Sequence, residues 1–447
     1  MIHWLAACAP EPVPSDRPEP TPPVVEEPFG LSGYTSRLHA TFPTLVYAGW
    51  TQVGTDTVRV EYATDEGWRS APASERGPGA HEQVLLGLPY DTVVRWRLVG
   101  EGSGVTSAEQ VAVTGSGAGV PVATVATSDP ARVDPTEFFL VGLAQGNAYR
   151  DEWWTLIVDR AGRPVWALPS PAGRTSRQAR IGRDGRSLYL DRSSFFPLLD
   201  QGAQSTIEEL TLEGDVLHTF AAPGLHHPFV DLPGGDVAYG RSIDWSQGSY
   251  VDEALTVVHR DGSTEDLWSC AAFLASIGWV DGCMSNTLNY DPASDTFLFS
   301  FFTSETVFEI GGDGSTARWF GHVPGAWTFD PPESAFWWQH GAHYTDAGTL
   351  LLSSDDAADA TETVVREYAL DDGVLREVWS FGVGQGVYGW QMGEAVRLPS
   401  GTTLHNYGRQ ARLREVTPEG EVVWDLTWAS TGVGHSLPVP DLYALVR

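Results

Sequence analysis

The sequence predicts an all-β protein, a six-bladed β-propeller preceded by a small β-sandwich. The chain has 18 Trp and 48 Gly among its 447 residues. Its apolar residues form short alternating runs that Gly, Pro and Asp interrupt, a pattern typical of antiparallel strands. In the longer C-terminal part, a unit of strand, turn and strand recurs six times at a spacing of about 50 residues. A shorter set of strand-like runs without this repeat precedes it.

The charge of the chain excludes several classes of function. Its formal net charge is −31, whereas nucleic-acid binding requires clustered Lys and Arg, so we expect no nucleic-acid partner. The sequence contains no Lys, so it has 27 Arg residues. This excludes a Schiff-base lysine and a P-loop lysine, and it means that every fixed cation of a site is an Arg.

The N-terminus carries a candidate export motif. Residues 1–8 end in LAAC, which resembles the lipobox of bacterial lipoproteins and follows a hydrophobic stretch that is short for a signal peptide. We expect a truncated signal with Cys8 as the lipidated residue. The protein would then be extracytoplasmic, in the periplasm or at the cell surface, and would meet the membrane only through its lipid anchor. The alternative is a disordered N-terminus with an accidental cysteine.

Residues 9–32 are rich in Pro and acidic side chains, which predicts an extended tether. Further along the chain, Cys270 and Cys283 are the cysteines that remain if Cys8 carries lipid. An even remainder in an exported protein indicates a disulfide, which would close a short loop and stabilise the fold by about 3 kcal/mol. The alternative is two buried thiols.

Residues 33–115 predict the β-sandwich. Runs such as TVRVEY at 57–62 and VVRWRL at 93–98 read as strands, and about seven short runs of this kind suit a sandwich of this size. The segment GLPYDT at 87–92 resembles the corner before strand F of fibronectin type III domains, except that Val94 stands where those domains have tyrosine. No residue here belongs to a catalytic pattern, so we expect a spacer or an accessory binding module.

Residues 120–447 predict the propeller. Similar Trp-rich antiparallel units at a period of about 50 residues are typical of propeller blades. The glycines in the turns of the six units are Gly162, Gly214, Gly262, Gly314, Gly373 and Gly420. A second turn falls between most of the units, at Gly185, Gly235, Asp295, Gly348 and Gly401.

This second set of turns predicts a ring of polar residues. If the strand before each turn is the innermost of its blade, equivalent positions on these strands surround one end of the central channel. The residues at those positions are Arg177, His227, Asn286, His340 and Gly393. A packed blade would hold Val or Ile there, so polar side chains indicate a ligand site on the propeller axis. The alternative is that these side chains only cap strand ends.

Two other kinds of chemistry are less well supported. A metal site from His226, His227, His340 and His343 has suitable residue types. However, neighbours on a strand point to opposite faces, so we expect no metal. A serine hydrolase of the α/β type would need a Gly-x-Ser-x-Gly turn, and the sequence contains none.

Three segments of the propeller carry a family resemblance, in the order and register of its blades. They are LHHPFVDLPGG at 225–235, NTLNYDP at 286–292 followed by FLFS at 297–300, and QHGA at 339–342 followed by GTL at 348–350. They resemble the His-His-Asp, His-x-Asn-Ser and Gln-His segments of the bacterial aryl-sulfate sulfotransferases, or arylsulfotransferases. The members of that family are six-bladed propellers in the periplasm or on the cell surface.

The resemblance implies transfer of a sulfuryl group from a small phenolic sulfate donor to a phenol acceptor, with no PAPS and no other cofactor. The family's nucleophile falls on His340, and His227 is the second expected catalytic residue. Asn286 matches a sulfate-binding position, and His226 belongs to the matched His-His segment. Arg177, which its register and not the resemblance places at the channel, is the third expected substrate-binding residue. A neutral imidazole can attack sulfur and hold the group covalently until the acceptor arrives.

The chain departs from the family at two sulfate-binding positions. Met284 stands where the family has histidine, and Phe302 where it has arginine. Each lost donor would remove about 2 to 4 kcal/mol of transition-state stabilisation. Two hypotheses follow: a sulfotransferase, favoured because His340 and His227 are both present, and a catalytically silent propeller that binds an aromatic or anionic ligand. Candidate aromatic lining residues are Trp337, Trp338, Tyr344 and Trp390.

Overall fold

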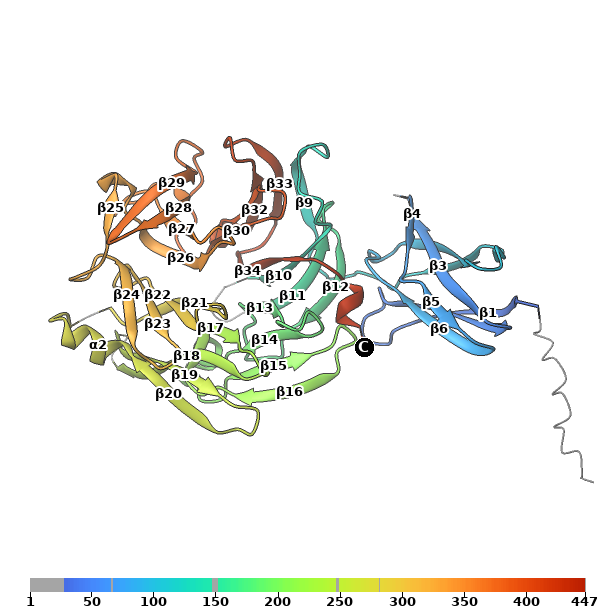
Figure 1. The fold of residues 1–447 in the computed structure, drawn as a ribbon, viewed down its shortest axis with the longest axis horizontal. Coiled ribbons are helices and arrows are strands. Elements are labelled where there is room, and N and C mark those ends of the chain that lie inside the picture. The colour runs from blue at the N-terminus through green and yellow to red at the C-terminus, as the bar shows by residue number, and fades with distance from the viewer. Residues whose placement is uncertain (1–27, 66, 147–151, 247–248, 281, 447) are drawn as a thin grey trace, which may run out of the picture.

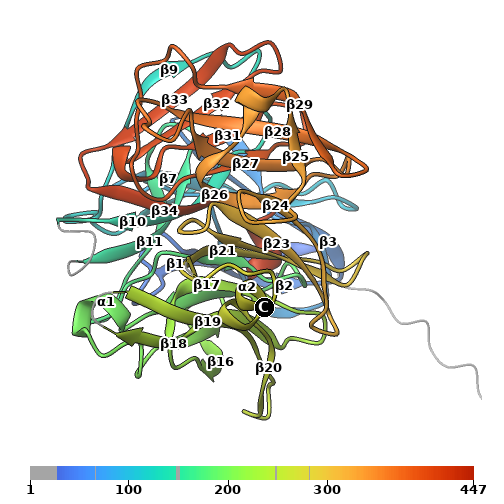
Figure 2. The same cartoon turned by 90° about the vertical axis from the view of Figure 1, so that its left-hand side faces the viewer.

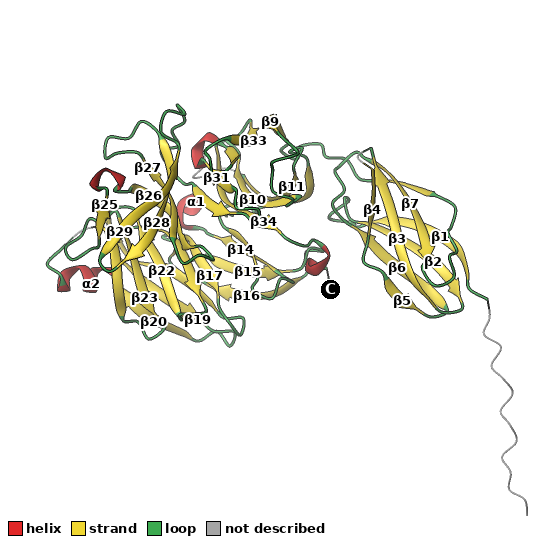
Figure 3. Cartoon of the chain, turned by 45° about the horizontal axis from the view of Figure 1, so that its top comes forward, coloured by secondary structure: helices red, strands yellow, loops and turns green. Residues whose placement is uncertain are grey.

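The computed structural model describes residues 28–65, 67–146, 152–246, 249–280 and 282–446. Two domains lie side by side along the long axis of the molecule, a small one formed by the N-terminal strands and a larger one formed by the rest (Figure 1). Strands make up nearly all of the regular structure in both (Figure 3). The predicted all-β fold class is therefore confirmed.

The small domain is a sandwich of two antiparallel sheets. Its strands are β1 (Gly30–Leu38), β2 (Val46–Val53), β3 (Asp56–Thr64), β4 (Gly67–Ser70), β5 (Ser74–Arg76), β6 (Gly79–Leu85), β7 (Val93–Gly100) and β8 (Gln110–Val113). The sheet orders are β1-β2-β6 and β4-β3-β7-β8, with β5 paired to β3. Alternate residues of β7 fill the core: Val94, Trp96 and Leu98 are buried, whereas Val93 and Arg95 are exposed.

The large domain is a propeller, and its described residues form six antiparallel blades of four strands. Each blade is given from its innermost strand outwards. The first consists of β34 (Gly432–Val439), β10 (Phe138–Ala144), β11 (Trp153–Asp159) and β12 (Pro164–Pro169), and the second of β13 (Ala179–Ile181), β14 (Leu188–Arg192), β15 (Thr206–Leu210) and β16 (Val216–Ala221). The third consists of β17 (Leu225–Asp231), β18 (Val237–Ser246), β19 (Ser249–Val258) and β20 (Thr264–Ser269). The other three are β21 (Ser285–Asp291), β22 (Thr296–Phe301), β23 (Thr306–Gly311) and β24 (Thr316–Gly321); β26 (Trp337–Tyr344), β27 (Leu350–Asp355), β28 (Thr363–Asp371) and β29 (Val374–Phe381); and β30 (Glu394–Arg397), β31 (Thr403–Asn406), β32 (Arg412–Val416) and β33 (Val422–Trp428).

Short elements complete the propeller. Strand β25 (Thr328–Asp330) adds to β29 in parallel. The helices are α1 (Phe195–Leu198), α2 (Cys270–Ser276) and the 3-10 turns η1 (Pro332–Ser334), η2 (Gly408–Gln410) and η3 (Tyr443–Leu445).

Both ends of the propeller domain close its ring. The last strand, β34, is the innermost strand of the blade that contains β10, with Leu437 opposite Leu140. At the outer edge of the last blade, β9 (Ala123–Ser128) pairs with β33. Neighbouring innermost strands pack on one another, β17 on β21 and β21 on β26 (Figure 2). The strand before each turn of the second set is therefore the innermost of its blade.

The two sets of turns lie at fixed places in the blades. The six repeated glycines turn the chain between the third and fourth strands, with φ from 79° to 89°. Glycine adopts this left-handed conformation without a steric penalty, which explains why it recurs at that point. The second set of turns joins the innermost strand of a blade to the next strand outwards.

The sandwich packs on the propeller through a shared apolar core. Phe42 of the sandwich stacks on Trp166 of β12 with ring centroids 5.0 Å apart. The indole Nε1 of Trp166 donates to the carbonyl oxygen of Leu212 at 2.7 Å. From the C-terminal end, the hydroxyl of Tyr443 hydrogen-bonds that of Tyr62 at 3.2 Å. The Gly-rich segment between the domains thus joins two surfaces that are in contact.

A disulfide joins Cys270, the first residue of α2, to Cys283, just before β21. This confirms the predicted pairing, and both cysteines are buried in the apolar core shared by two blades. Cys8 and residues 9–27 of the expected tether lie outside the described residues. In the part of the chain that the structure describes, no helix has the length and apolar character needed to cross a membrane.

Candidate active site

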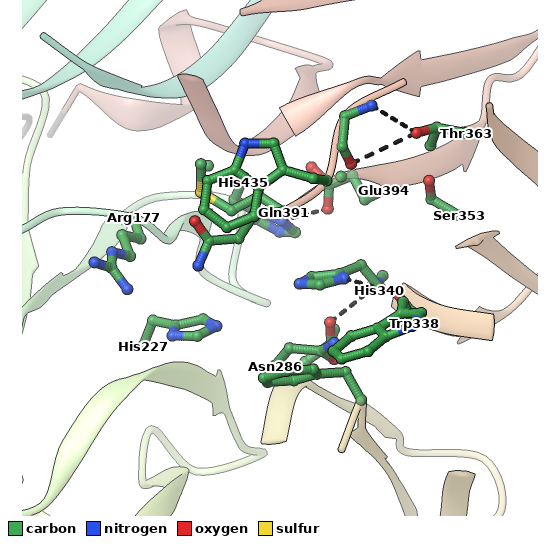
Figure 4. Close-up of a pocket in the computed structure, with 18 of the residues that line it drawn as sticks. Arg177, His227, Asn286, Trp338, His340, Ser353, Thr363, Gln391, Glu394 and His435 are labelled. Carbon is green, nitrogen blue, oxygen red and sulfur yellow. Dashed lines mark hydrogen bonds and ion pairs between the residues drawn. The ribbon is translucent and has the colours of Figure 1, made fainter. Parts of the chain in front are cut away.

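A pocket lies at one end of the propeller axis, where the innermost strands meet (Figure 4). Its cavity has a volume of about 150 Å³. The ring positions derived from the sequence all line it: Arg177, His227, Asn286, His340 and Gly393. They come from five different blades. They meet in one pocket because equivalent positions at the innermost strands lie at the same end of the channel.

Strand β26 presents His340 at the wall of this pocket. Its neighbour Gln339 is fully buried and donates from Nε2 to the hydroxyl of Ser300 and the carbonyl of Phe301, both at 3.1 Å. On the other side, the amide of Gly341 donates to Oγ1 of Thr287 at 2.9 Å. Because β26 is tied to the next blade on both sides of His340, the imidazole is held in place.

The hydrogen bonds of His340 define its protonation state. Its Nδ1 lies 3.2 Å from the carbonyl oxygen of Trp338, and an imidazole nitrogen beside a carbonyl must carry the proton. Burial lowers the pKa of His340 to about 4, against the smaller opposing effect of the Trp338 carbonyl. At neutral pH the ring is therefore uncharged, and its Nε2 carries a free electron pair.

A buried hydrogen-bond chain lies behind His227. The Nδ1 atoms of His227 and His226 are 2.9 Å apart, and Nε2 of His226 lies 3.3 Å from a carboxylate oxygen of Glu253 on β19. The amide of Ser285 donates to the same carboxylate oxygen at 2.9 Å. His226 is fully buried and does not line the pocket. It contacts His227 from behind the pocket wall.

His227 is a neutral hydrogen-bonding group. Burial lowers its pKa well below the ordinary value, and the neighbouring His226 and Arg177 lower it further. A ring that resists protonation in this way is a poor general base, but it can still exchange hydrogen bonds with a ligand.

Arg177 and Asn286 contribute different polar groups. Arg177 is the single arginine among the described residues of the pocket wall. It is 6% exposed, and its guanidinium carbon lies 4.4 Å from the ring centroid of Phe196. Asn286 donates from Nδ2 to the carbonyl of Gln339 at 2.6 Å. An amide nitrogen carries two protons, so one N–H of Asn286 remains for a ligand.

Aromatic and apolar side chains form the wall next to His340. The ring of Phe302 stacks on His340 at a centroid distance of 6.1 Å and an interplanar angle of 22°, and Phe302 also packs on Trp338 at 5.7 Å. Met284 and Trp390 line the same pocket. The other two aromatic candidates are not part of it: Trp337 does not line the pocket, and Tyr344 lines a second cavity further along the innermost strands, together with His343.

Three acidic or basic residues of the pocket were missed by the sequence analysis: Asp355, Glu394 and His435. His435 lies on β34, which completes the first blade from the far end of the chain and is not followed by a hairpin turn, so the register count could not reach it. Glu394 directly follows the ring position Gly393. Asp355 ends β27, where burial, with a smaller contribution from Asp356, raises its pKa to about 7. No sequence motif marked these residues.

The histidines considered as metal ligands are divided between different surroundings. His226 and His227 are bonded to each other, His340 faces the pocket, and His343 faces the second cavity. Within the described ranges, no group of three His, Cys, Asp or Glu side chains has an arrangement that could hold a metal ion.

Comparison with known proteins identifies no family for the chain. No protein-family model and no curated protein matches it. Similar solved structures include a protein of unknown function from Bacteroides caccae, with 15% identity and a TM-score of 0.44 over 68% of this chain and 100% of that one. TolB from Acinetobacter baumannii has 10% identity and a TM-score of 0.46 over 79% and 80%. The periplasmic gluconolactonase of Pseudomonas aeruginosa has 15% identity and a TM-score of 0.40 over 87% and 100%. Sequence identities and TM-scores this low assign no activity to this chain.

Proposed function

We propose that this pocket transfers a sulfuryl group from an aryl sulfate to a phenol through a sulfo-histidine at His340. The observation that supports this function best is the state of the His340 ring. The carbonyl of Trp338 fixes the proton on Nδ1, burial keeps the ring neutral, and Nε2 has no hydrogen-bond partner among the described residues. A neutral imidazole with a free Nε2 at a pocket wall is a competent nucleophile.

The reaction would take place in two displacements at sulfur. In the first, Nε2 of His340 attacks the sulfur of the donor, the S–O bond to the donor phenol breaks, and the electron pair leaves with the phenolate. In the second, the acceptor oxygen attacks the same sulfur, the S–N bond breaks, and its electron pair returns to Nε2. The acceptor loses one proton and the leaving phenolate gains one, so the overall exchange balances.

Groups from other blades would stabilise the sulfuryl oxygens. Arg177 supplies positive charge, Asn286 an amide N–H, and His227 a neutral imidazole opposite His340 (Figure 4). Fixed donors of this kind act most strongly where water is excluded. Arg177 thereby compensates in part for the arginine that Phe302 replaces. The aromatic wall of Phe302, Trp338 and Trp390 fits the planar ring of a phenol.

The rival function is ligand binding without chemistry. The specific observation in its favour is the stacking of Phe302 on His340, at the position where the resemblance has a sulfate-binding arginine. An aromatic or anionic ligand held between Phe302, Trp390 and Arg177 would use the same pocket with no sulfo-histidine.

We also propose that the protein acts outside the cytoplasm, anchored by a lipid on Cys8. The disulfide between Cys270 and Cys283 supports export, because disulfides persist in oxidising compartments. Metabolic labelling with a radioactive fatty acid tests the anchor: the label should enter the parent protein and not a Cys8→Ser variant. A label-free parent would exclude it.

Release of a coloured phenol tests the enzyme. The purified chain is mixed with 4-nitrophenyl sulfate, with and without an excess of phenol, beside His340→Gln and a matched His322→Gln variant. His322 also packs against an aromatic ring, that of Trp337 at a centroid distance of 4.1 Å, but does not line the pocket. The parent and His322→Gln should release 4-nitrophenol faster when phenol is present, and His340→Gln should release none. A folded parent that releases none refutes the transferase and favours the binding function.

A further inference from the structure

A buried histidine and carboxylate pair forms another part of the pocket wall. His435 on β34 and Glu394 at the start of β30 are 8% and 5% exposed, and Nδ1 of His435 hydrogen-bonds Oε2 of Glu394. The amide and hydroxyl of Ser436 both donate to Oε1 of the same carboxylate. Every oxygen of Glu394 therefore has a fixed donor, and the carboxylate can hold the ring of His435 in one orientation.

The pair adjoins the proposed nucleophile. The backbone of Gly341, directly after His340, packs on Glu394 so closely that a Cβ atom at position 341 would lie 2.5 Å from the Cβ of Glu394. On the opposite side, the amide of His435 donates to the carbonyl oxygen of Arg177 at 2.7 Å. Figure 4 shows the pair facing the same pocket as His340 and His227. The pair is thus tied to both predicted residues through the backbone, with Glu394 against the residue that follows His340 and His435 against Arg177.

The second ring nitrogen of His435, Nε2, is buried and has no hydrogen-bond partner among the described residues. Because Nδ1 donates its proton to Glu394, the neutral ring has its free electron pair on Nε2. A buried nitrogen without a partner is energetically unfavourable, and a phenolic hydroxyl is a donor that would satisfy it.

We propose that His435 is the general base that takes the proton of the acceptor phenol, and that Glu394 is the residue that positions it. This inference rests on the proposed sulfuryl transfer. The phenol O–H would donate to Nε2 of His435, and its proton would move there as the phenol oxygen attacks the sulfur on His340. The S–N bond breaks, its electron pair returns to Nε2 of His340, and the aryl sulfate leaves. Protonated His435 then returns the proton to the leaving phenolate of the next donor.

Such a base is needed because phenols are weak acids, with a pKa near 10, and are almost entirely protonated at neutral pH. The two other candidates are less suitable. His227 already shares its Nδ1 with His226 and resists protonation. Asp355 lines the pocket, but its Oδ2 faces the hydroxyl of Tyr388 at 3.5 Å. The orientation of His435 by a carboxylate is the arrangement that general bases commonly have.

The test separates the two displacements. Rapid mixing with 4-nitrophenyl sulfate alone measures the burst of 4-nitrophenol, whose phenolate leaves without needing a proton. Addition of phenols of decreasing acidity then measures transfer to the acceptor. We expect His435→Gln to slow transfer to unactivated phenol by about 10² to 10⁴-fold and the burst by far less. Glu394→Gln should lower kcat for the acceptor about tenfold with an unchanged acceptor KM, a split that a merely structural residue would not produce.

Two variants serve as controls. His259→Gln removes a similar histidine and carboxylate pair, with Nδ1 2.8 Å from Asp236, in the surface turn that follows β19, and should leave both steps unchanged. Asp355→Asn tests the competing base. If it abolishes acceptor transfer while His435→Gln does not, the inference is wrong.

The outcomes distinguish this inference from the proposed function. A parent without a burst refutes the transferase, and the base with it. A parent with a burst, and a His435→Gln variant that still transfers to phenol at the parent rate, refutes the base alone. If His435→Gln does not fold, the solvent deuterium isotope effect on acceptor transfer is measured in the parent protein instead. The absence of such an effect would show that no side chain removes a proton in that step, and would overturn the inference.

Discussion

Removing the aromatic ring that covers His340 should raise the pKa of its imidazole. Phe302 stacks on this ring at 6.1 Å, and burial is the main cause that lowers the pKa to about 4. With that pKa, about 90% of the rings are neutral at pH 5, compared with about 3% for an imidazole of ordinary pKa. Phe302→Ala admits water to the ring, so we expect its titration midpoint to rise by at least about one pH unit towards 6.5.

NMR titration of the protein labelled with ¹⁵N-histidine measures this midpoint, and loss of a signal in His340→Gln assigns it. Phe329→Ala is the matched control, because Phe329 lies 5.9 Å from the ring of another histidine, His322, outside the pocket. It should leave the His340 midpoint unchanged. A parent midpoint near 6.5, or an identical midpoint in Phe302→Ala, would refute the reasoning that burial controls this ring.

The same shift predicts a pH dependence of stability. The folded pKa of His340 lies below the unfolded value of about 6.5, so its contribution is present above pH 6.5 and is lost as the pH falls towards 4. The difference between the unfolded and folded pKa values corresponds to about 3 kcal/mol of stability. We expect roughly half of this, because the half-buried ring borders water in the pocket. When the pH is lowered from 7.5 to 4.5, the free energy of unfolding measured with urea should therefore fall by about 1 kcal/mol more in the parent than in His340→Gln.

Three further predictions concern the fold and the pocket. Replacing Cys270 and Cys283 by alanine opens a link between residues 13 apart and should lower the free energy of unfolding by about 2 to 3 kcal/mol, measured by urea unfolding; a parent equally stable with and without reductant would contradict this. Trp166→Ala removes the stack on Phe42 and the hydrogen bond to Leu212 and should cost about 3 to 5 kcal/mol, whereas Trp68→Ala, at a side chain 41% exposed in the sandwich, should cost under about 1 kcal/mol in calorimetry. Phe302→Arg restores a charge-assisted donor beside His340 and should raise kcat/KM for 4-nitrophenyl sulfate about 10- to 100-fold; an unchanged or lower value would argue against sulfate binding at that wall.

Much of this architecture could be read from the sequence because it depends on local interactions. Alternating side chains define strands, and a turn with positive φ requires glycine, so blade units are visible at Gly162, Gly214 and their repeats. Once the blades are in register, the period of two along each strand also places Arg177, His227, Asn286 and His340 at one mouth of the channel. The disulfide followed from the count of cysteines alone.

The rest depends on contacts between residues far apart in the chain. His435 lies in the pocket because β34, near the C-terminus, pairs with β10 near the start of the domain. No local sequence pattern specifies such a strand partner. The hydrogen bond of His435 to Glu394 and the packing of Trp166 against Phe42 are likewise set by how the blades and domains meet. The protonation state of His340 is a further example, since it depends on burial by Phe302 and on the carbonyl of Trp338. Sequence periodicity thus determined the blades and the ring of polar residues, whereas ring closure and burial, which are non-local, decided the hydrogen-bond partners and protonation states of the groups that line the pocket.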